Sequence, residues 1–533
     1  MDHIRGPHGG GYRPPLDRLR GASAAVGASA AGTHGHCGPL SYLVRQEVGL
    51  STPVSSSEET SHLRRVLGQR DLVLLFVVAV LNLNLVPVVA ADGPVTLWLW
   101  LLALLLFFWP QAIAVIELSH RYPSEGGIYL WAKELFGDFH GFLSGWCYWT
   151  NNVFYIPTLL LYAVGISVYV GGERTRLLGD DRLFVLMFSL SLLWLMVGLH
   201  IRGLGVGKWV NNLGGVGTVI TAVALMSLAA YVLRSQGSRL TLASFRSAGA
   251  DWRLVSSFGV VCFGLVGLEL ASVMGDEIRD PRRTLPRAVL WGGIISGGLY
   301  VGATLALLLA LPQQEIGVVQ GVLQAVDRMA QNAGIAWLVR PLALLLSLSI
   351  AGATSAWLAG SARIPFVAGI DCYLPSALGR LHPRYASPHV ALLVHAGLSC
   401  VFLAMSFIGA TVKEAYEILL HLAVILQLIP FLYMFAALVR LARHGDPTQA
   451  YYRKGPLLTA GFSGFAITAL GIGLAFVPPP QISSIWRFEA KTMIGSVFFV
   501  GLGAMLFRIY AARKPGKAWK PDRPKSVYPG EGL

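Results

Sequence analysis

Residues 82–87 (NLNLVP) and residues 263–269 (FGLVGLE) place helix-breaking and polar residues inside two long apolar segments. Proline removes a backbone hydrogen-bond donor and clashes with the preceding turn, and glycine weakens a helix interior. Asparagine and glutamate are costly in hydrocarbon unless polar partners surround them. Both stretches therefore predict helices that are interrupted at membrane depth.

These stretches lie in the first and the sixth of twelve apolar segments. The chain has 533 residues, of which 54% are hydrophobic and 13% are charged, and its mean hydropathy is +0.59. A soluble chain would carry about twice that charge. Because about 17–25 apolar residues span a bilayer and the backbone there must satisfy its own hydrogen bonds, we expect twelve transmembrane helices. The segments are residues 72–91, 97–116, 142–170, 183–199, 210–233, 258–274, 288–311, 342–358, 390–408, 418–439, 457–477 and 493–507.

The formal net charge of +14 does not indicate a nucleic-acid partner, because the basic residues are spread through short loops between apolar segments. The loops alone give a weak orientation bias, and the tails decide it. We therefore expect a multi-pass protein of the cell inner membrane with both termini in the cytoplasm. The basic residues of the tails are Arg64, Arg65, Arg70, Arg508, Arg513, Lys514, Lys517 and Lys520.

The two interrupted segments are five helices apart, which suggests an internal repeat. An odd number of spans inverts the second copy, and matching interruptions in two halves indicate the central site of a transporter. We expect repeat one at 71–233, repeat two at 255–442 and two further helices at 456–511, within a transporter domain of residues 63–512. The alternative is two kinked structural helices. Residues 1–62 and 513–533 are expected to be a disordered cytoplasmic tail and a basic cytoplasmic tail.

Three further motifs carry a resemblance to a known family. Residues 117–129 (ELSHRYPSEGGIY), 275–287 (GDEIRDPRRTLPR) and 361–375 (SARIPFVAGIDCYLP) are similar to signatures of the amino acid–polyamine–organocation (APC) permeases. The similarity extends over about residues 63–443. The resemblance implies a LeuT-type fold with the substrate between helices 1 and 6, its carboxylate on free amides of helix 1 and its amino group on carbonyls of helix 6.

The sequence departs from that family pattern at two places. The usual glycines in the break of helix 1 are replaced by residues 83–88 (LNLVPV), so a carboxylate has less room to approach the backbone. Decarboxylated amines such as polyamines are therefore candidate substrates alongside amino acids. Some proton-coupled members also carry a lysine in helix 5 where this chain has Thr218.

Glu269 is the sharpest candidate for function, because a carboxyl at bilayer depth must pair, face a cavity or be protonated. We expect it to bind a substrate ammonium group or a coupling proton; the alternative is a hydrogen bond that ties helix 6 to a neighbour. The family pattern places a pocket asparagine at Asn151, for which an interhelical hydrogen bond is equally plausible. The candidate substrate-binding residues are Asn82, Asn84, Leu85, Val86, Cys147, Asn151, Phe263, Gly264, Val266, Gly267 and Glu269.

Other polar residues in or near the apolar segments are expected to make structural contacts. Glu117, at the end of the second segment, is interpreted as a helix-end contact. His395, His421 and Gln427 are lone polar groups in the ninth and tenth segments, and each is expected to form a structural hydrogen bond.

The sequence contains no phosphate-binding glycine loop, no metal-ligand spacing and no nucleophile elbow, so we expect neither an enzyme nor a cofactor or metal. The prediction is a secondary active transporter of amino acids or polyamines, working by proton symport or exchange. The alternatives are an integral-membrane enzyme and a receptor that uses a transporter fold without transport.

Overall fold

The computed structural model describes residues 66–123, 126–237, 257–312, 315–317, 320–405, 412–478 and 485–513. Helices make up most of this part of the chain, and its β-structure is a single parallel bridge between Leu67 and Ile278. The predicted tails, residues 1–62 and 513–533, lie outside the described residues except for Arg513.

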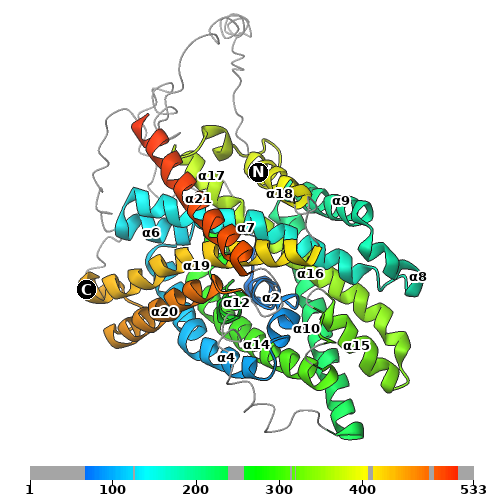
Figure 1. Ribbon diagram of the computed structural model, residues 1–533. Coiled ribbons are helices and arrows are strands. Elements are labelled where there is room, and N and C mark those ends of the chain that lie inside the picture. Colours follow the sequence, from blue (N-terminus) through cyan, green and yellow to red (C-terminus); the bar gives the residue numbers. More distant parts are fainter. Residues whose placement is uncertain are drawn as a thin grey trace, which may run out of the picture. The chain divides into compact units, whose positions relative to one another are not determined.

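The helices follow the predicted segments in chain order (Figure 1). Those of the first half are α2 (Gln69–Val80), α3 (Leu85–Ala90), α4 (Val95–Ala103), η1 (Leu104–Phe108), α5 (Trp109–Arg121), α6 (Ile128–Phe136), α7 (Asp138–Ser167), α8 (Glu173–Arg176), η2 (Leu177–Asp180), α9 (Arg182–Ile201) and α10 (Leu204–Gln236). Those of the second half are α12 (Phe258–Gly264), α13 (Leu270–Val273), η5 (Gly275–Glu277), α14 (Pro281–Ala310), α15 (Gly321–Asn332), η7 (Ala336–Leu338), α16 (Val339–Ser361), α17 (Arg363–Ile370), η8 (Ser376–Gly379), α18 (His389–Met405), α19 (Val412–His444), η9 (Pro447–Gln449), α20 (Lys454–Ala475) and α21 (Ile485–Ala512).

Nine helical segments of the described residues are long and apolar enough to cross a membrane. Three predicted segments fall short of that criterion for different physical reasons. The helix α7 has 30 residues but is rich in polar and amphipathic side chains, α12 and α13 are separate short helices, and α18 has 17 residues. The chain is therefore an all-helical membrane protein, and the count of twelve spans stays a prediction.

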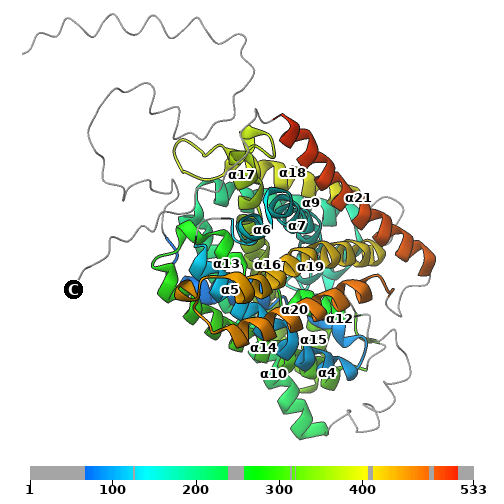
Figure 2. The same cartoon turned by 90° about the vertical axis from the view of Figure 1, so that its left-hand side faces the viewer.

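Large apolar side chains cover the outside of the helical bundle. Leu105 and Trp209 are 65% and 69% exposed, and Ile494 and Val497 on the peripheral helix α21 are 69% and 68% exposed (Figure 2). Exposed apolar surface on this scale is unfavourable in water and is satisfied by lipid.

The two predicted interruptions are present and lie at the centre of the bundle (Figure 1). The helix α2 ends at Val80 and α3 begins at Leu85. Pro87 lies inside α3, and the carbonyl with which its ring would clash belongs to Leu83 in the gap. The second gap separates α12 from α13, and within it Gly267 has a φ of 137°, which favours glycine.

The second predicted span contains a π-helical turn that the sequence did not indicate. The turn η1 lies between α4 and α5, so the three segments form one continuous helix with a wider turn in its middle. Such turns are often found at functional sites. Gln111 lies three residues after this turn, on α5.

The helices that contain or surround the two interruptions pack against one another in the core. The central helix α2 contacts α10, α14 and α16, and α7 contacts α16. Further pairs in contact are α10 with α16, α7 with α19, α7 with α18, α9 with α16, α9 with α18, α4 with α12 and α12 with α19.

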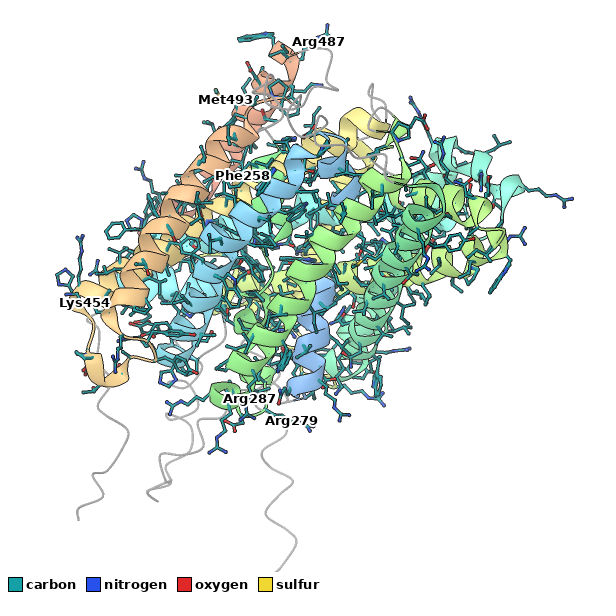
Figure 3. The ribbon with its side chains drawn as sticks, turned by 90° about the horizontal axis from the view of Figure 1, so that it is seen from below. Phe258, Arg279, Arg287, Lys454, Arg487 and Met493 are labelled. Carbon is teal, nitrogen blue, oxygen red and sulfur yellow. The ribbon has the colours of Figure 1, made fainter. Side chains whose placement is uncertain are left out.

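One end of the bundle, called the ion-pair end below, is held by three ion pairs: Asp71–Lys208, Glu277–Arg363 and Lys133–Asp371. The backbone of Val66 and Leu67 also donates to the carbonyl of Glu277, which joins the start of α2 to the segment after α13. Arg279 and Arg287 lie at this end, and Arg487 lies at the opposite one (Figure 3).

Tyr129 on α6 adds to these contacts at the ion-pair end, because its hydroxyl donates to the Asp371 carboxylate over 2.6 Å. Burial, together with this neighbouring carboxylate, raises the pKa of Tyr129 well above its ordinary value. The phenol therefore remains a hydrogen-bond donor at physiological pH.

Glu117 makes the helix-end contact that its position predicted. Its carboxylate accepts from Arg121 Nε over 2.6 Å and from the backbone N–H groups of Tyr451 and Tyr452 over 3.0 and 2.9 Å. This carboxylate therefore joins the end of α5 to the segment before α20.

The Glu277–Arg363 pair gives a test of how the ion-pair end is held. Both side chains are about 5% exposed, and Arg363 Nε lies 2.7 Å from Glu277 Oε2. We expect Arg363→Met to lower stability by about 3–5 kcal/mol, because it removes one member of a buried ion pair and leaves the other charge buried. The measurement is the thermal unfolding midpoint of the purified protein in detergent.

The double variant Glu277→Leu/Arg363→Met is the control for this change. It removes both charges, so it should regain most of the lost stability. A single Arg363→Met variant that unfolds at the wild-type temperature would contradict the assignment.

Candidate functional site

Glu269 lies in the gap between α12 and α13 and is completely buried. Its Oε2 accepts from Gln111 Nε2 over 3.1 Å and from the backbone N–H of Gly267 over 2.9 Å. Its Oε1 accepts from the hydroxyl of Tyr148 over 3.1 Å and from Gln427 Nε2 over 3.4 Å. All four partners are donors, which suits a carboxylate because an ionised carboxylate only accepts.

Glu269 has no ion-pair partner among the described residues. An ionised carboxylate without a counter-ion is expensive at membrane depth, even when neutral donors surround it. Binding of a cation or a proton would therefore lower the energetic cost of burying this carboxyl.

Asn151 belongs to the same network, one step further from the carboxylate. Its side-chain amide contacts that of Gln427, which in turn reaches Glu269. Tyr148 and Asn151 are three residues apart on α7, so both lie on one helix face, which meets α19 and the gap that holds Glu269. The network thus joins helices that are far apart in the sequence.

In the gap of helix 1, Asn82 satisfies the local backbone. Its Nδ2 donates to the carbonyl of Ala79 over 2.6 Å, and its backbone N–H donates to the hydroxyl of Tyr300 over 2.9 Å. Asn84, Leu85 and Val86 are buried at the start of α3. These four predicted residues therefore lie together at the interruption.

In the gap of helix 6, the two glycines allow close approach of other elements. A Cβ at Gly267 would lie 3.0 Å from Val80 Cγ2 and 3.1 Å from the carbonyl carbon of Ala79, so the gap of helix 6 packs against the end of α2, beside the gap of helix 1. A Cβ at Gly264 would lie 3.1 Å from the indole of Trp100. A larger residue would press on the end of α2 at Gly267 and on the Trp100 indole at Gly264.

The remaining predicted residues are buried beside these groups. The Phe263 ring packs edge-on against Tyr155, with centroids 4.9 Å apart, and Val266 is fully buried. Cys147 is buried on α7 but takes no part in the hydrogen bonds described for Glu269. The neighbouring residue, Tyr148, makes that contact instead.

The expected structural hydrogen bonds of the lone polar residues are also present. His395 accepts from Trp149 Nε1 over 3.1 Å, and His421 Nδ1 lies 3.3 Å from the carbonyl of Ala475. Gln427 is hydrogen-bonded as well, but its partner is Glu269, so it belongs to the candidate site. Thr218 donates to the carbonyl of Gly214 over 2.9 Å.

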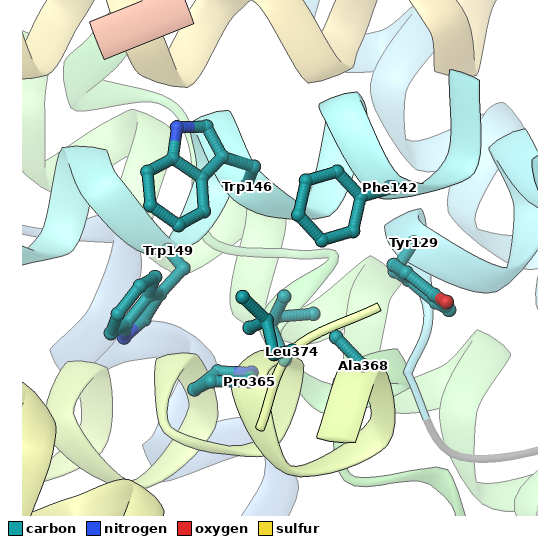
Figure 4. Close-up of a pocket in the computed structure, with 8 residues that line it drawn as sticks. Tyr129, Phe142, Trp146, Trp149, Pro365, Ala368 and Leu374 are labelled. Atoms are coloured by element: carbon teal, nitrogen blue, oxygen red, sulfur yellow. The ribbon is translucent and has the colours of Figure 1, made fainter. Parts of the chain in front are cut away.

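Two cavities of the described residues lie away from Glu269. A small apolar pocket is lined by aromatic and aliphatic side chains of α6, α7 and α17, including Trp146, Phe142 and Pro365 (Figure 4). A wider, open pocket is lined by Tyr169, Arg176, Asp327 and Arg340 among others. Neither is lined by a predicted site residue.

The described residues contain no group of three or more His, Cys, Asp or Glu side chains that could hold a metal ion.

Three residues of the site were not found from the sequence: Gln111, Tyr148 and Tyr300. Gln111 is the polar residue in a segment that otherwise reads as apolar, which was a usable signal. Tyr148 and Tyr300 carried little signal, because tyrosine is common in buried helices and the partner groups lie far away in the chain.

An all-helical membrane bundle with two interrupted helices around a buried carboxyl defines the class of a transporter, and comparisons with known proteins identify the family. Residues 67–501 match the amino acid permease family model. The chain belongs to this family, which consists of transporters rather than enzymes.

The chain is similar to several bacterial transporters. An uncharacterized transporter of Legionella pneumophila is 29% identical over 83% of this chain and 96% of the relative. A probable agmatine/putrescine antiporter of Lactococcus lactis is 21% identical over 79% and 90% of the two chains. A glutamate/γ-aminobutyrate antiporter of the same species is 25% identical over 77% and 83%.

The fold is similar to that of the LeuT-fold transporter MhsT, solved in complex with L-phenylalanine. The TM-score is 0.56 at 12% identity, over 84% of this chain and 99% of MhsT. The likeness is therefore one of fold.

Gly267 gives a test of the contact between the two gaps. Gly267→Ala should lower stability by about 1–3 kcal/mol, because alanine is strained at this positive φ and its Cβ would press on Val80. The measurement is again the thermal unfolding midpoint in detergent.

Gly298→Ala is the matched control for the Gly267 substitution. Gly298 lies inside α14 with open space around the added Cβ, so alanine should leave stability unchanged or raise it by up to about 1 kcal/mol. If both variants unfold alike, the close approach at Gly267 is not a constraint on the fold.

Proposed function

We propose that this chain is a secondary active transporter of amino acids or polyamines that works by alternating access, with its substrate between the two interrupted helices. The observation that carries the proposal is Glu269, a fully buried carboxyl in the gap of helix 6 that has no cationic partner among the described residues. A substrate ammonium group or a coupling proton would supply the missing positive charge.

The membership of the permease family and the names of two relatives support this substrate class. Agmatine, putrescine and γ-aminobutyrate all carry an amino group, and the antiporters named for them are similar to this chain over more than three quarters of its length. The names do not choose between exchange and proton symport for this chain, and both remain within the proposal.

The finer fold assignment is twelve transmembrane helices with two inverted repeats of five. Helix packing supports it, because contacts between spans have counterparts between the equivalent spans of the other repeat. Span 1 is equivalent to span 6, span 2 to span 7, and so on to spans 5 and 10; α7, α9 and α10 are spans 3, 4 and 5, and α16, α18 and α19 are spans 8, 9 and 10. The contact of α10 with α16 maps onto that of α19 with α7, and α7 with α18 maps onto α16 with α9. An experimental structure in which spans 1–5 do not superpose on spans 6–10 would overturn this assignment.

The proposed orientation places the ion-pair end and both termini in the cytoplasm. Arg279 and Arg287 lie at that end, in agreement with the excess of basic residues that cytoplasmic loops carry. Labelling of single cysteines from one side of intact cells tests this directly.

Replacement of Glu269 tests the proposed mechanism. Glu269→Gln keeps the size of the side chain and removes its charge, so uptake should fall by at least about tenfold, equivalent to about 1.4 kcal/mol. The measurement is uptake of labelled putrescine, agmatine, ornithine and arginine into proteoliposomes with an imposed proton gradient or a preloaded exchange substrate.

Glu134→Gln is the matched control, since Glu134 is an exposed carboxylate on α6. It should transport at the wild-type rate. Wild-type transport by Glu269→Gln would show that the charge is dispensable, and a wild-type protein that binds these solutes without accumulating or exchanging them would be a receptor.

A further inference from the structure

Tyr300 connects the two helix interruptions through one hydroxyl group. The residue lies on α14 and is completely buried. Its hydroxyl oxygen is 2.9 Å from the backbone N of Asn82, 2.6 Å from the carbonyl of Val80 and 3.0 Å from the carbonyl of Gly264. The first two groups belong to helix 1 and the third to helix 6.

This hydroxyl acts both as a hydrogen-bond donor and as an acceptor. A tyrosine hydroxyl has one proton, so it accepts from the Asn82 N–H and donates to one of the two carbonyls at a time. The ring is held in place by Trp100, which stacks on it with centroids 4.3 Å apart. The hydroxyl is therefore positioned by α4 as well as by the two gaps.

The groups that Tyr300 occupies are those that would recognise an α-amino acid. A backbone N–H within an interrupted helix can donate to a carboxylate, and free carbonyls at a helix end favour an ammonium group. Here both kinds of group meet a neutral side chain instead. Glu269 makes none of these hydrogen bonds: its carboxylate accepts from the N–H of Gly267, and Gly267 packs against Val80 Cγ2.

We propose that Tyr300 is a specificity-determining residue that disfavours an α-carboxylate, because its hydroxyl occupies the backbone N–H of Asn82 and the backbone carbonyls of Val80 and Gly264. This inference rests on the proposed function and goes beyond it by assigning the selectivity to one side chain. A decarboxylated amine needs only the Glu269 region for its ammonium group. An α-amino acid must also displace the Tyr300 hydroxyl, or its carboxylate receives no hydrogen bond from the backbone N–H of Asn82.

Tyr300→Phe tests the assignment, because phenylalanine keeps the ring that stacks on Trp100 and removes only the hydroxyl. The Asn82 N–H then keeps its bond to the Val80 carbonyl, while the N–H and both carbonyls lose the tyrosine hydroxyl as a partner, which opens that position to the substrate. The preference for an amino acid over its decarboxylated amine should rise by about tenfold, since a hydrogen bond to a charged group is stronger than one between neutral groups.

The measurement is direct binding to the purified full-length protein by titration calorimetry with two matched pairs, ornithine with putrescine and arginine with agmatine. The readout is the ratio of the two dissociation constants within each pair. A general loss of stability changes both members of a pair equally, so it leaves this ratio unchanged.

Tyr129→Phe is the control, because it also removes a buried hydroxyl hydrogen bond but at the ion-pair end of the bundle. It should leave both ratios at their wild-type values. If Tyr300→Phe binds the compounds with wild-type ratios, Tyr300 does not determine selectivity while the proposed function stands. If the wild-type protein binds none of the four compounds, the proposed function fails and this inference fails with it.

Discussion

The structure depends on the satisfaction of backbone hydrogen bonds where two helices are interrupted inside the membrane. No water is available in hydrocarbon to solvate an exposed N–H or carbonyl, so each gap must find its partners within the protein. In this chain the two interrupted helices are packed and hydrogen-bonded together at their gaps. The glycine of one packs directly on the backbone of the other, and a single tyrosine hydroxyl from a third helix bonds to both.

Charge is distributed differently between the centre and the ends of the bundle. At the ion-pair end, Asp71, Glu277 and Asp371 each contact a basic side chain from another element. At the centre, Glu269 contacts two amides, a phenol and a backbone N–H, all neutral. Ion pairs hold this end of the bundle together, whereas neutral donors surround the carboxyl at its centre.

Much of the fold was predictable from the sequence, because apolar length and helix-breaking residues act locally. The gaps follow from Pro87 in one helix and from Gly264 and Gly267 in the other, and the role of Glu117 follows from its place at a helix end. The partners of Glu269 were predictable only in part. Which face of α7 meets which face of α19 depends on packing between distant segments, so the sequence did not indicate that Tyr148 bonds to Glu269.

The π-helical turn η1 places Gln111 opposite Glu269, and it does so by accommodating one residue more than an α-helical turn. One residue corresponds to a rotation of about 100° around the helix axis. In two permeases that differ by this single insertion, the wider turn would absorb that rotation, so the same helix faces would meet the same neighbours although positions after the turn are numbered one residue apart. Equivalent positions in such a pair are defined by rotation about the axis and not by counting residues along the chain.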